Sequence, residues 1–181
     1  MSMLSRLRIA LLVGLFSVLL VSAAGCGNGS TTADEVDQTG AEANAQTQTQ
    51  AELDREFHQA IIDQDEEIAL RLLDEGASPD TPTEQGVSPL HLAARSGLLE
   101  VVIQLVLAGV EIDPVVAPDM TPLHWAIRAE SVEVTQFLIE SGADVNHQAG
   151  NRMTALDLAR GAEHEELIAL LEAHGAVSGL N

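Results

Sequence analysis

The sequence predicts an all-α protein built from about four stacked helix-turn-helix repeats. A six-residue motif and a glycine each recur at a constant interval of 33 residues. The motif occurs at Thr121–Ala126, with a near copy at Ser88–Ala93, a weaker copy at Thr154–Ala159 and a remnant at Phe57–Ala60. The glycines, each after an apolar run, are Gly76, Gly109, Gly142 and Gly175. Such periods are typical of solenoids, whose units bury apolar surface only against their neighbours.

Each motif predicts the start of a helix. The hydroxyl of Thr121 can cap the first free N–H groups, and Pro122 suits the first helical position because its missing N–H costs nothing there. His124 follows the cap by three residues, where a side chain can reach back as in a capping box. Ser88 begins the same arrangement one repeat earlier. The 33-spaced glycines suit the left-handed residue that ends a second helix.

A T-P-L-H-x-A signature at this period resembles the ankyrin repeat. The resemblance covers residues 51–181 and divides them into four repeats, which are 51–83, 84–116, 117–149 and 150–181. It implies an ankyrin-repeat solenoid of helix-turn-helix units joined by short hairpin-like loops.

Apolar residues recur at equivalent positions of the four repeats and predict the core. The columns are Phe57, Leu90, Leu123 and Leu156; Ala60, Ala93, Ala126 and Ala159; Ile68, Val101, Val134 and Leu167; and Leu72, Leu105, Leu138 and Leu171. Asp157 and Glu172 replace the usual His and apolar residue in the last repeat, so we expect them on an outer face exposed to water.

The first helix of the second repeat is predicted to end near Gly97. Its counterparts in the other repeats are Gln64, Glu130 and Glu163. If these positions require positive φ, each non-glycine residue loses about 1 kcal/mol relative to glycine.

Residues 1–25 are predicted to be a lipoprotein signal peptide. Two arginines precede an apolar run over 9–20, as in a secretory signal. Ala23–Cys26 resembles the bacterial lipoprotein cleavage box, with Ala23 in place of the usual Leu, and the resemblance implies that Cys26 is the lipidated first residue. An ordinary cleaved signal or an uncleaved anchor is the alternative, although Ile9–Ala24 has 16 residues against the ~20 of a membrane span.

Residues 26–52 are rich in Gly, Ser, Thr, Gln and Ala, and they predict a flexible tether that begins with the lipidated Cys26. Such a coil would span about 28 Å on average, enough to hold a small domain clear of a bilayer. The alternative is a disordered leader without a role. Gly27 follows the cysteine, and by the same resemblance this favours location in the outer membrane. We therefore expect a lipoprotein of the bacterial cell envelope, periplasmic or attached to the outer membrane.

The composition excludes several classes of function. The net charge of −20 would repel phosphate backbones, which argues against nucleic-acid binding. One cysteine rules out an intramolecular disulfide. The sequence contains no nucleophile elbow, phosphate-binding loop or His-Glu-x-x-His motif, so we expect neither an enzyme nor a cofactor.

The histidines are expected to be structural and not metal ligands. His58, His91 and His124 repeat at intervals of 33 residues, which places neighbours about 10 Å apart, whereas zinc ligands lie about 2 Å from one ion. The remaining three have no partner at ligand spacing; they are His147, His164 and His174.

The resemblance implies that a partner protein is bound by the loop tips and by the concave face of the first helices. The matching positions in the second repeat are Glu84, Gln85, Val87, Leu92, Arg95 and Ser96. Those in the third are Pro118, Asp119, Met120, Trp125, Arg128 and Ala129, and those in the fourth are Asn151, Arg152 and Met153.

Trp125 is the only tryptophan, and Trp and Arg most often dominate binding energy. Arg95, Arg128 and Arg152 would form a positive ladder beside it. The alternative is that Trp125 packs on the neighbouring repeat and the arginines pair with nearby acids. We therefore expect a binding module; bacterial ankyrin proteins are associated with stress-protective enzymes and with neutralising toxic effectors. A structural envelope lipoprotein without one specific client is the alternative, and an enzyme or metal binder ranks third.

Overall fold

The computed structural model describes residues 38–180, with side chains from Thr49 to Leu180. The expected signal peptide and Cys26 lie outside this range. Eight helices make up the described part, and they follow one another as four helix-turn-helix pairs. They are α1 (Gln38–Ile62), α2 (Glu66–Asp74), α3 (Pro89–Ser96), α4 (Leu99–Leu107), α5 (Pro122–Arg128), α6 (Val132–Glu140), α7 (Ala155–Gly161) and α8 (Glu165–Ala173).

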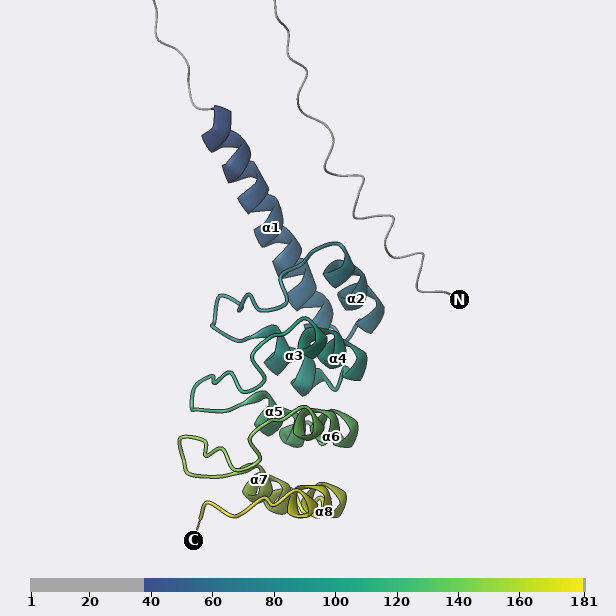
Figure 1. The fold of residues 1–181 in the computed structure, drawn as a ribbon, viewed down its shortest axis with the longest axis vertical. Helices are drawn as coiled ribbons and strands as arrows, with labels where there is room; N and C mark the ends of the chain where they lie inside the picture. Colours follow the sequence, from purple (N-terminus) through teal and green to yellow (C-terminus); the bar gives the residue numbers. More distant parts are fainter. Residues whose placement is uncertain (1–37, 181) are drawn as a thin grey trace, which may run out of the picture. The chain divides into compact units, whose positions relative to one another are not determined.

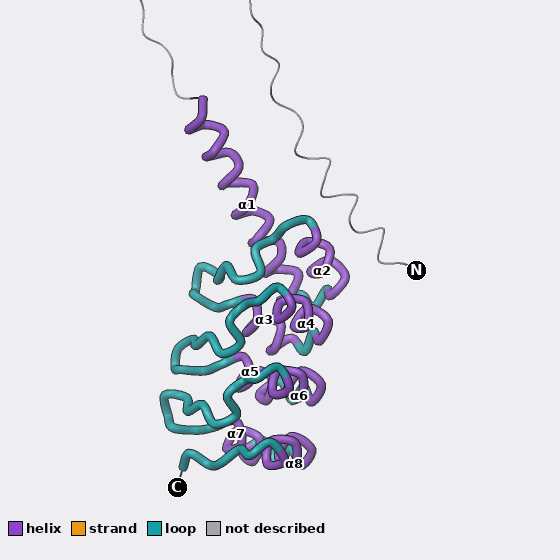
Figure 2. The backbone as a smooth tube through the Cα atoms, in the orientation of Figure 1, coloured by secondary structure: helices purple, strands orange, loops and turns teal. Residues whose placement is uncertain are grey.

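The pairs stack in chain order, so that equivalent helices are neighbours. The first helices of each repeat (α1, α3, α5 and α7) contact one another in sequence, and the second helices (α2, α4, α6 and α8) form a parallel row (Figure 1). The long loops between pairs project on the side of α3, α5 and α7 that faces away from the second row (Figure 2). The all-α repeat solenoid is therefore confirmed.

The loops have the hairpin-like form that was expected. Backbone N–H groups donate across each tip from Thr83 to Val87, from Val116 to Met120 and from Ala149 to Met153. Val116 and Met120 also form an isolated antiparallel bridge. Because these pairs are again 33 residues apart, the loops repeat as regularly as the helices.

The predicted helix caps are confirmed. The hydroxyl of Ser88 accepts the backbone N–H of His91, and Thr121 and His124 form a capping box at the start of α5. The backbone N–H of Thr121 donates to Nδ1 of His124 at 3.3 Å. A cap of this kind stabilises a helix by about 1 kcal/mol.

The repeated histidines also tie each helix to a loop, which the sequence did not reveal. Nε2 of His91 donates to the carbonyl of Met120 at 3.0 Å, and Nε2 of His58 donates to the carbonyl of Thr81 at 2.9 Å. Because Nε2 of His91 carries the proton, its Nδ1 accepts from the Ser88 hydroxyl at 2.8 Å. Burial lowers the pKa of both His58 and His91, which favours these neutral forms.

The predicted core columns are buried with one exception. The exception is Ile68, which is 37% exposed on α2, whereas its counterparts in the later repeats are fully buried. Ile68 belongs to the first pair of the stack, where no earlier repeat covers it. The aliphatic core is otherwise continuous through all four pairs.

The predicted positive-φ turn recurs in all four repeats. Gly97 has φ of 70°, and its counterparts Gln64, Glu130 and Glu163 have φ of 60°, 56° and 56°. Side chains with a Cβ atom are disfavoured in this region, so three of the four inner turns carry local strain.

The tether expected over residues 26–52 differs from the structure where the two overlap, because residues 38–52 belong to α1. Ala, Glu and Gln, which are frequent there, are good helix formers. The C-terminal part of α1 packs on α2 and α3, and a packed segment of this kind supplies the nucleus from which a helix can extend. The composition of residues 26–52 indicated that they cannot form a hydrophobic core, but it did not exclude a helix.

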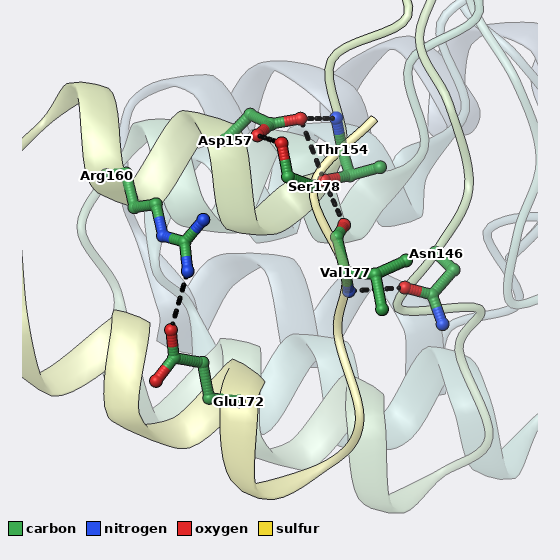
Figure 3. Close-up of polar contacts among 7 residues, drawn as sticks. All are labelled: Asn146, Thr154, Asp157, Arg160, Glu172, Val177 and Ser178. Atoms are coloured by element: carbon green, nitrogen blue, oxygen red, sulfur yellow. Dashed lines mark hydrogen bonds and ion pairs between the residues drawn. The ribbon is translucent and has the colours of Figure 1, made fainter. Parts of the chain in front are cut away.

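The expectation that Asp157 faces water is wrong. Asp157 is buried and accepts hydrogen bonds from the backbone N–H of Thr154 at 3.0 Å and of Gly179 at 2.8 Å. The hydroxyl of Ser178 donates to its other oxygen at 2.6 Å (Figure 3). The C-terminal segment thus replaces the loop of a further repeat, and Asp157 holds it. Glu172 is exposed as expected and pairs with Arg160 at 2.8 Å.

Within the described residues, no helix combines the length and the apolar character that crossing a bilayer requires.

Candidate functional site

Trp125 lies on α5 and contacts side chains of the preceding repeat. Its indole is partly buried and packs against the core. The ring of His91, on α3, meets it edge-on at a centroid distance of 5.2 Å. The guanidinium carbon of Arg95, one turn further along α3, lies 5.3 Å from the ring centre. Trp125 therefore joins two repeats and still presents part of its surface to solvent.

A surface hollow of about 360 Å³ lies at this point of the stack. Its lining is made of Arg95 from α3 together with Trp125, Arg128 and Ala129 at the end of α5. All four were singled out from the sequence as partner-facing positions. The structure brings them together because residues at equivalent places in adjacent repeats become neighbours when the repeats stack.

The arginines of the predicted ladder have no acidic partner in the described part of the chain. Ion pairs form between Arg55 and Glu84, Arg71 and Glu75, and Arg160 and Glu172. Arg95, Arg128 and Arg152 form none. The closest polar contact of Arg128 is from Nη1 to the sulfur of Met120 at 3.9 Å. Of the alternative, the packing of Trp125 on a neighbouring repeat is present, whereas ion pairs that would neutralise the ladder are absent among the described residues.

Arg152 stands apart from the other two arginines. It lies in the loop between α6 and α7 and is not among the residues that line the hollow. Its φ is 65°, and Asp119 and Gly86, at the equivalent places of the earlier loops, have φ of 58° and 76°. The ladder is thus two arginines on helices and one at a loop tip.

Two predicted loop-tip residues are exposed in each of the three loops. Exposed side chains are those of Glu84, Gln85, Pro118, Asp119, Asn151 and Arg152. They are available to a partner, although Glu84 is engaged by Arg55. The carbonyl of Asp119 accepts a hydrogen bond from Nε2 of His147 at 3.2 Å.

Several predicted contact residues serve the fold instead. Leu92 is 3% exposed in the core, because α3 is flanked by both α1 and α5. Met120 is 8% exposed. The hydroxyl of Ser96 donates to the carbonyl of Ile61 at 2.9 Å. Val87 and Met153 are partly buried at the base of their loops. Leu92 and Met120 are therefore corrections to the predicted binding set.

One supporting residue of this site was missed, and one predicted residue has a different role. His91, which was not predicted to be part of the site, positions the indole of Trp125, and Met120, predicted to face a partner, contacts the guanidinium of Arg128 instead. The 33-residue period could have identified His91, because it makes Leu92 equivalent to Trp125 and His91 is next to Leu92 in the sequence. The Met120 contact depends on the path of the loop, which the period does not specify.

His124 and His147 lie closer together than the sequence indicated. Their ring centroids are 5.9 Å apart, because the loop after α6 returns to α5. Burial, followed by the neighbouring His147, lowers the pKa of His124 to about 4. Among the residues that the structure describes, no cluster of three His, Cys, Asp or Glu side chains could hold a metal ion.

Comparison with known families agrees with this architecture. A model described as ankyrin repeats (3 copies) matches residues 57–149 and 107–179, which together span well over half of the chain. The chain belongs to the ankyrin-repeat family. No curated protein matches it. Ankyrin repeats mediate protein–protein interactions and are typically non-catalytic.

Within an ankyrin-repeat solenoid, the residues around Trp125 occupy the first helices of two successive repeats. The hollow they line and the exposed loop tips are the positions at which the sequence predicted contact with another protein. An aromatic ring and two arginines that line one hollow have the composition of a binding hot spot.

Proposed function

We propose that this ankyrin-repeat chain is a non-catalytic binding module of the bacterial cell envelope. It grips a partner protein through the Trp125 face, which we define as Arg95, Trp125, Arg128 and Ala129, together with the tips of the loops. The observation that carries the proposal is the hollow lined by Trp125 and by two arginines that form no ion pair in the described part of the chain. The hollow is already formed in the chain alone, so binding there would need little reorganisation.

The partner is a protein of the same compartment. By the resemblance to bacterial ankyrin proteins, a stress-protective enzyme and a toxic effector are the two kinds of client to test first. Nucleic acid is not expected, because a chain with net charge −20 repels phosphate backbones.

The test is capture from a detergent extract of the envelope with the full chain as bait. A Trp125→Ala, Arg128→Ala double variant is run beside it, and circular dichroism checks that the variant is folded. An Arg71→Ala variant is the matched control, since Arg71 is exposed on α2. The proposal expects one protein that the wild type and the control enrich and the double variant loses. Equal recovery by all three baits would contradict it and favour a structural lipoprotein without a specific client.

We further propose that Cys26 attaches the chain to a membrane through lipid. The support is the Ala23–Cys26 cleavage box after an apolar run. A Cys26→Ser variant is expected to lose incorporation of labelled palmitate and to leave the membrane fraction. Wild-type chain without label, or variant that stays in the membrane fraction, would contradict the lipid attachment.

A further inference from the structure

We infer that the Trp125 face receives an acidic segment of the partner, with a carboxylate held by Arg95 and Arg128 and an apolar group against Trp125. This inference rests on the proposed function and adds the chemistry of the partner.

The first step is the distribution of charge. The chain has 28 acidic residues against 8 basic ones, so an exposed arginine would be expected to find a carboxylate nearby. Arg55, Arg71 and Arg160 do so. Arg95 and Arg128 do not, although both line the same hollow. Two guanidiniums that line one hollow without a counter-charge attract an anion from outside the chain.

The second step is the position of the guanidiniums. Arg95 is stacked over the Trp125 ring at 5.3 Å, and Arg128 contacts the sulfur of Met120 at 3.9 Å. The first contact uses the face of the Arg95 guanidinium and the second uses Nη1 of Arg128, so each guanidinium keeps further N–H groups that can donate. A carboxylate can take two parallel hydrogen bonds from one guanidinium, which fixes the orientation of the ligand as well as its charge.

The third step is selectivity. An acidic segment is repelled by the acidic surface around the hollow and attracted at the Trp125 face, which favours one register of docking. Apolar neighbours of the carboxylate would cover Trp125 and Ala129 and exclude water from the ion pair. A nucleic acid offers no comparable fit, because its phosphates extend well beyond the hollow onto acidic surface.

The experiment uses the fluorescence of Trp125, which is the only tryptophan in a chain without tyrosine. The full chain is titrated with a short capped peptide of alternating Glu and Leu, and in parallel with its Gln and Leu counterpart. The Glu peptide is expected to bind at least about tenfold more tightly. Arg95→Gln and Arg128→Gln are each expected to weaken it about tenfold, whereas Arg71→Gln leaves it unchanged.

Equal binding of the two peptides, unchanged binding to both arginine variants, or a Kd above about 1 mM for the Glu peptide would overturn the inference. Tighter binding of a phosphoserine peptide than of the Glu peptide would overturn it in favour of a phosphorylated partner. Failure of this inference can be distinguished from failure of the proposed function. If a client protein is lost by the Trp125→Ala, Arg128→Ala variant and retained by an Arg95→Gln, Arg128→Gln variant, the chain is still a binding module, and only the inferred recognition of a carboxylate is wrong.

Discussion

Arg95 lies over the ring of Trp125, with its guanidinium carbon 5.3 Å from the ring centre. The two residues come from α3 and α5 and are brought together only by the stacking of two repeats. Because the indole also meets His91 edge-on at 5.2 Å, its environment reports on the packing between these repeats. The same geometry that stabilises the interface therefore makes Trp125 a probe of it.

Arg95→Gln is expected to lower the free energy of unfolding by about 0.5–1 kcal/mol, the usual contribution of an exposed cation–π pair. It is also expected to shift the emission maximum of Trp125, because the indole loses a covering side chain. Urea unfolding followed by fluorescence gives both quantities. Arg71→Gln on α2 is the control, and an emission spectrum identical to that of the wild type would contradict the stacking.

Asp157→Asn is expected to lower the free energy of unfolding by about 1.5–3 kcal/mol at pH 7, since it removes charge-assisted hydrogen bonds to Ser178 and Gly179. Urea unfolding measures the loss. Asp74→Asn, at an exposed position of α2, is the control. A loss no larger than that of the control would show that the C-terminal segment does not depend on Asp157.

The difference in stability between the wild type and Asp157→Asn should depend on pH. Burial raises the pKa of Asp157, but the hydrogen bonds from Ser178, Thr154 and Gly179 outweigh it and place the pKa below its ordinary value of 3.8. A carboxyl group whose pKa is depressed by folding stabilises the protein above its unfolded pKa and ceases to do so as the pH falls through the folded one. The difference between wild type and Asp157→Asn should therefore narrow below about pH 4. A difference that stays constant down to pH 2 would contradict this.

His124 is expected to destabilise the fold in mild acid. Burial, followed by the His147 charge, lowers its pKa from 6.5 to about 4. The unfolded chain then takes up the proton first, so stability is complete above pH 6.5 and falls as the pH drops towards 4. The contribution is about 3 kcal/mol. The free energy of unfolding should fall less between pH 7 and pH 5 for His124→Gln than for the wild type. His174→Gln, at an exposed position, is the control. Parallel profiles for wild type and His124→Gln would refute the shift.

The inner turns offer a matched pair of substitutions. Glu130 has φ of 56°, so Glu130→Gly is expected to raise the free energy of unfolding by about 0.5–1 kcal/mol. Gly97→Ala is expected to lower it by about 1 kcal/mol. A Cβ at Gly97 would meet only Ser131, at ordinary contact distances of 3.6 and 3.8 Å, so the cost comes from the backbone and not from crowding. Loss of stability in Glu130→Gly would show that the turn is not strained.

Much of the fold could be predicted because the same sequence pattern recurs in each repeat. The spacing of Thr121 and His124, repeated at Ser88 and His91, predicted where α3 and α5 begin and that a side chain reaches back to the cap. The aliphatic columns followed from the same period. The two ends of the stack were less predictable, since Ile68 and Asp157 keep the positions of the pattern but have a neighbouring repeat on one side only.

The candidate site was predictable as a set of positions but not as an arrangement. Equivalent numbering placed Arg95 and Arg128 one repeat apart, yet the stacking of Arg95 on Trp125 depends on side-chain rotamers. Leu92 was misjudged because its position in the period is the same as that of Trp125, while the packing of α1 and α5 on either side of α3 decides its burial. The contact between His124 and His147 required the path of a loop.

The most direct test of the account is the affinity of the captured partner, purified and titrated calorimetrically against the full chain and its folded Trp125→Ala variant. If the Trp125 face is the binding site, the variant should bind at least about 30-fold more weakly, which corresponds to the roughly 2 kcal/mol of a hot-spot residue. Equal affinity of wild type and variant would place the interface elsewhere on the solenoid and contradict the account.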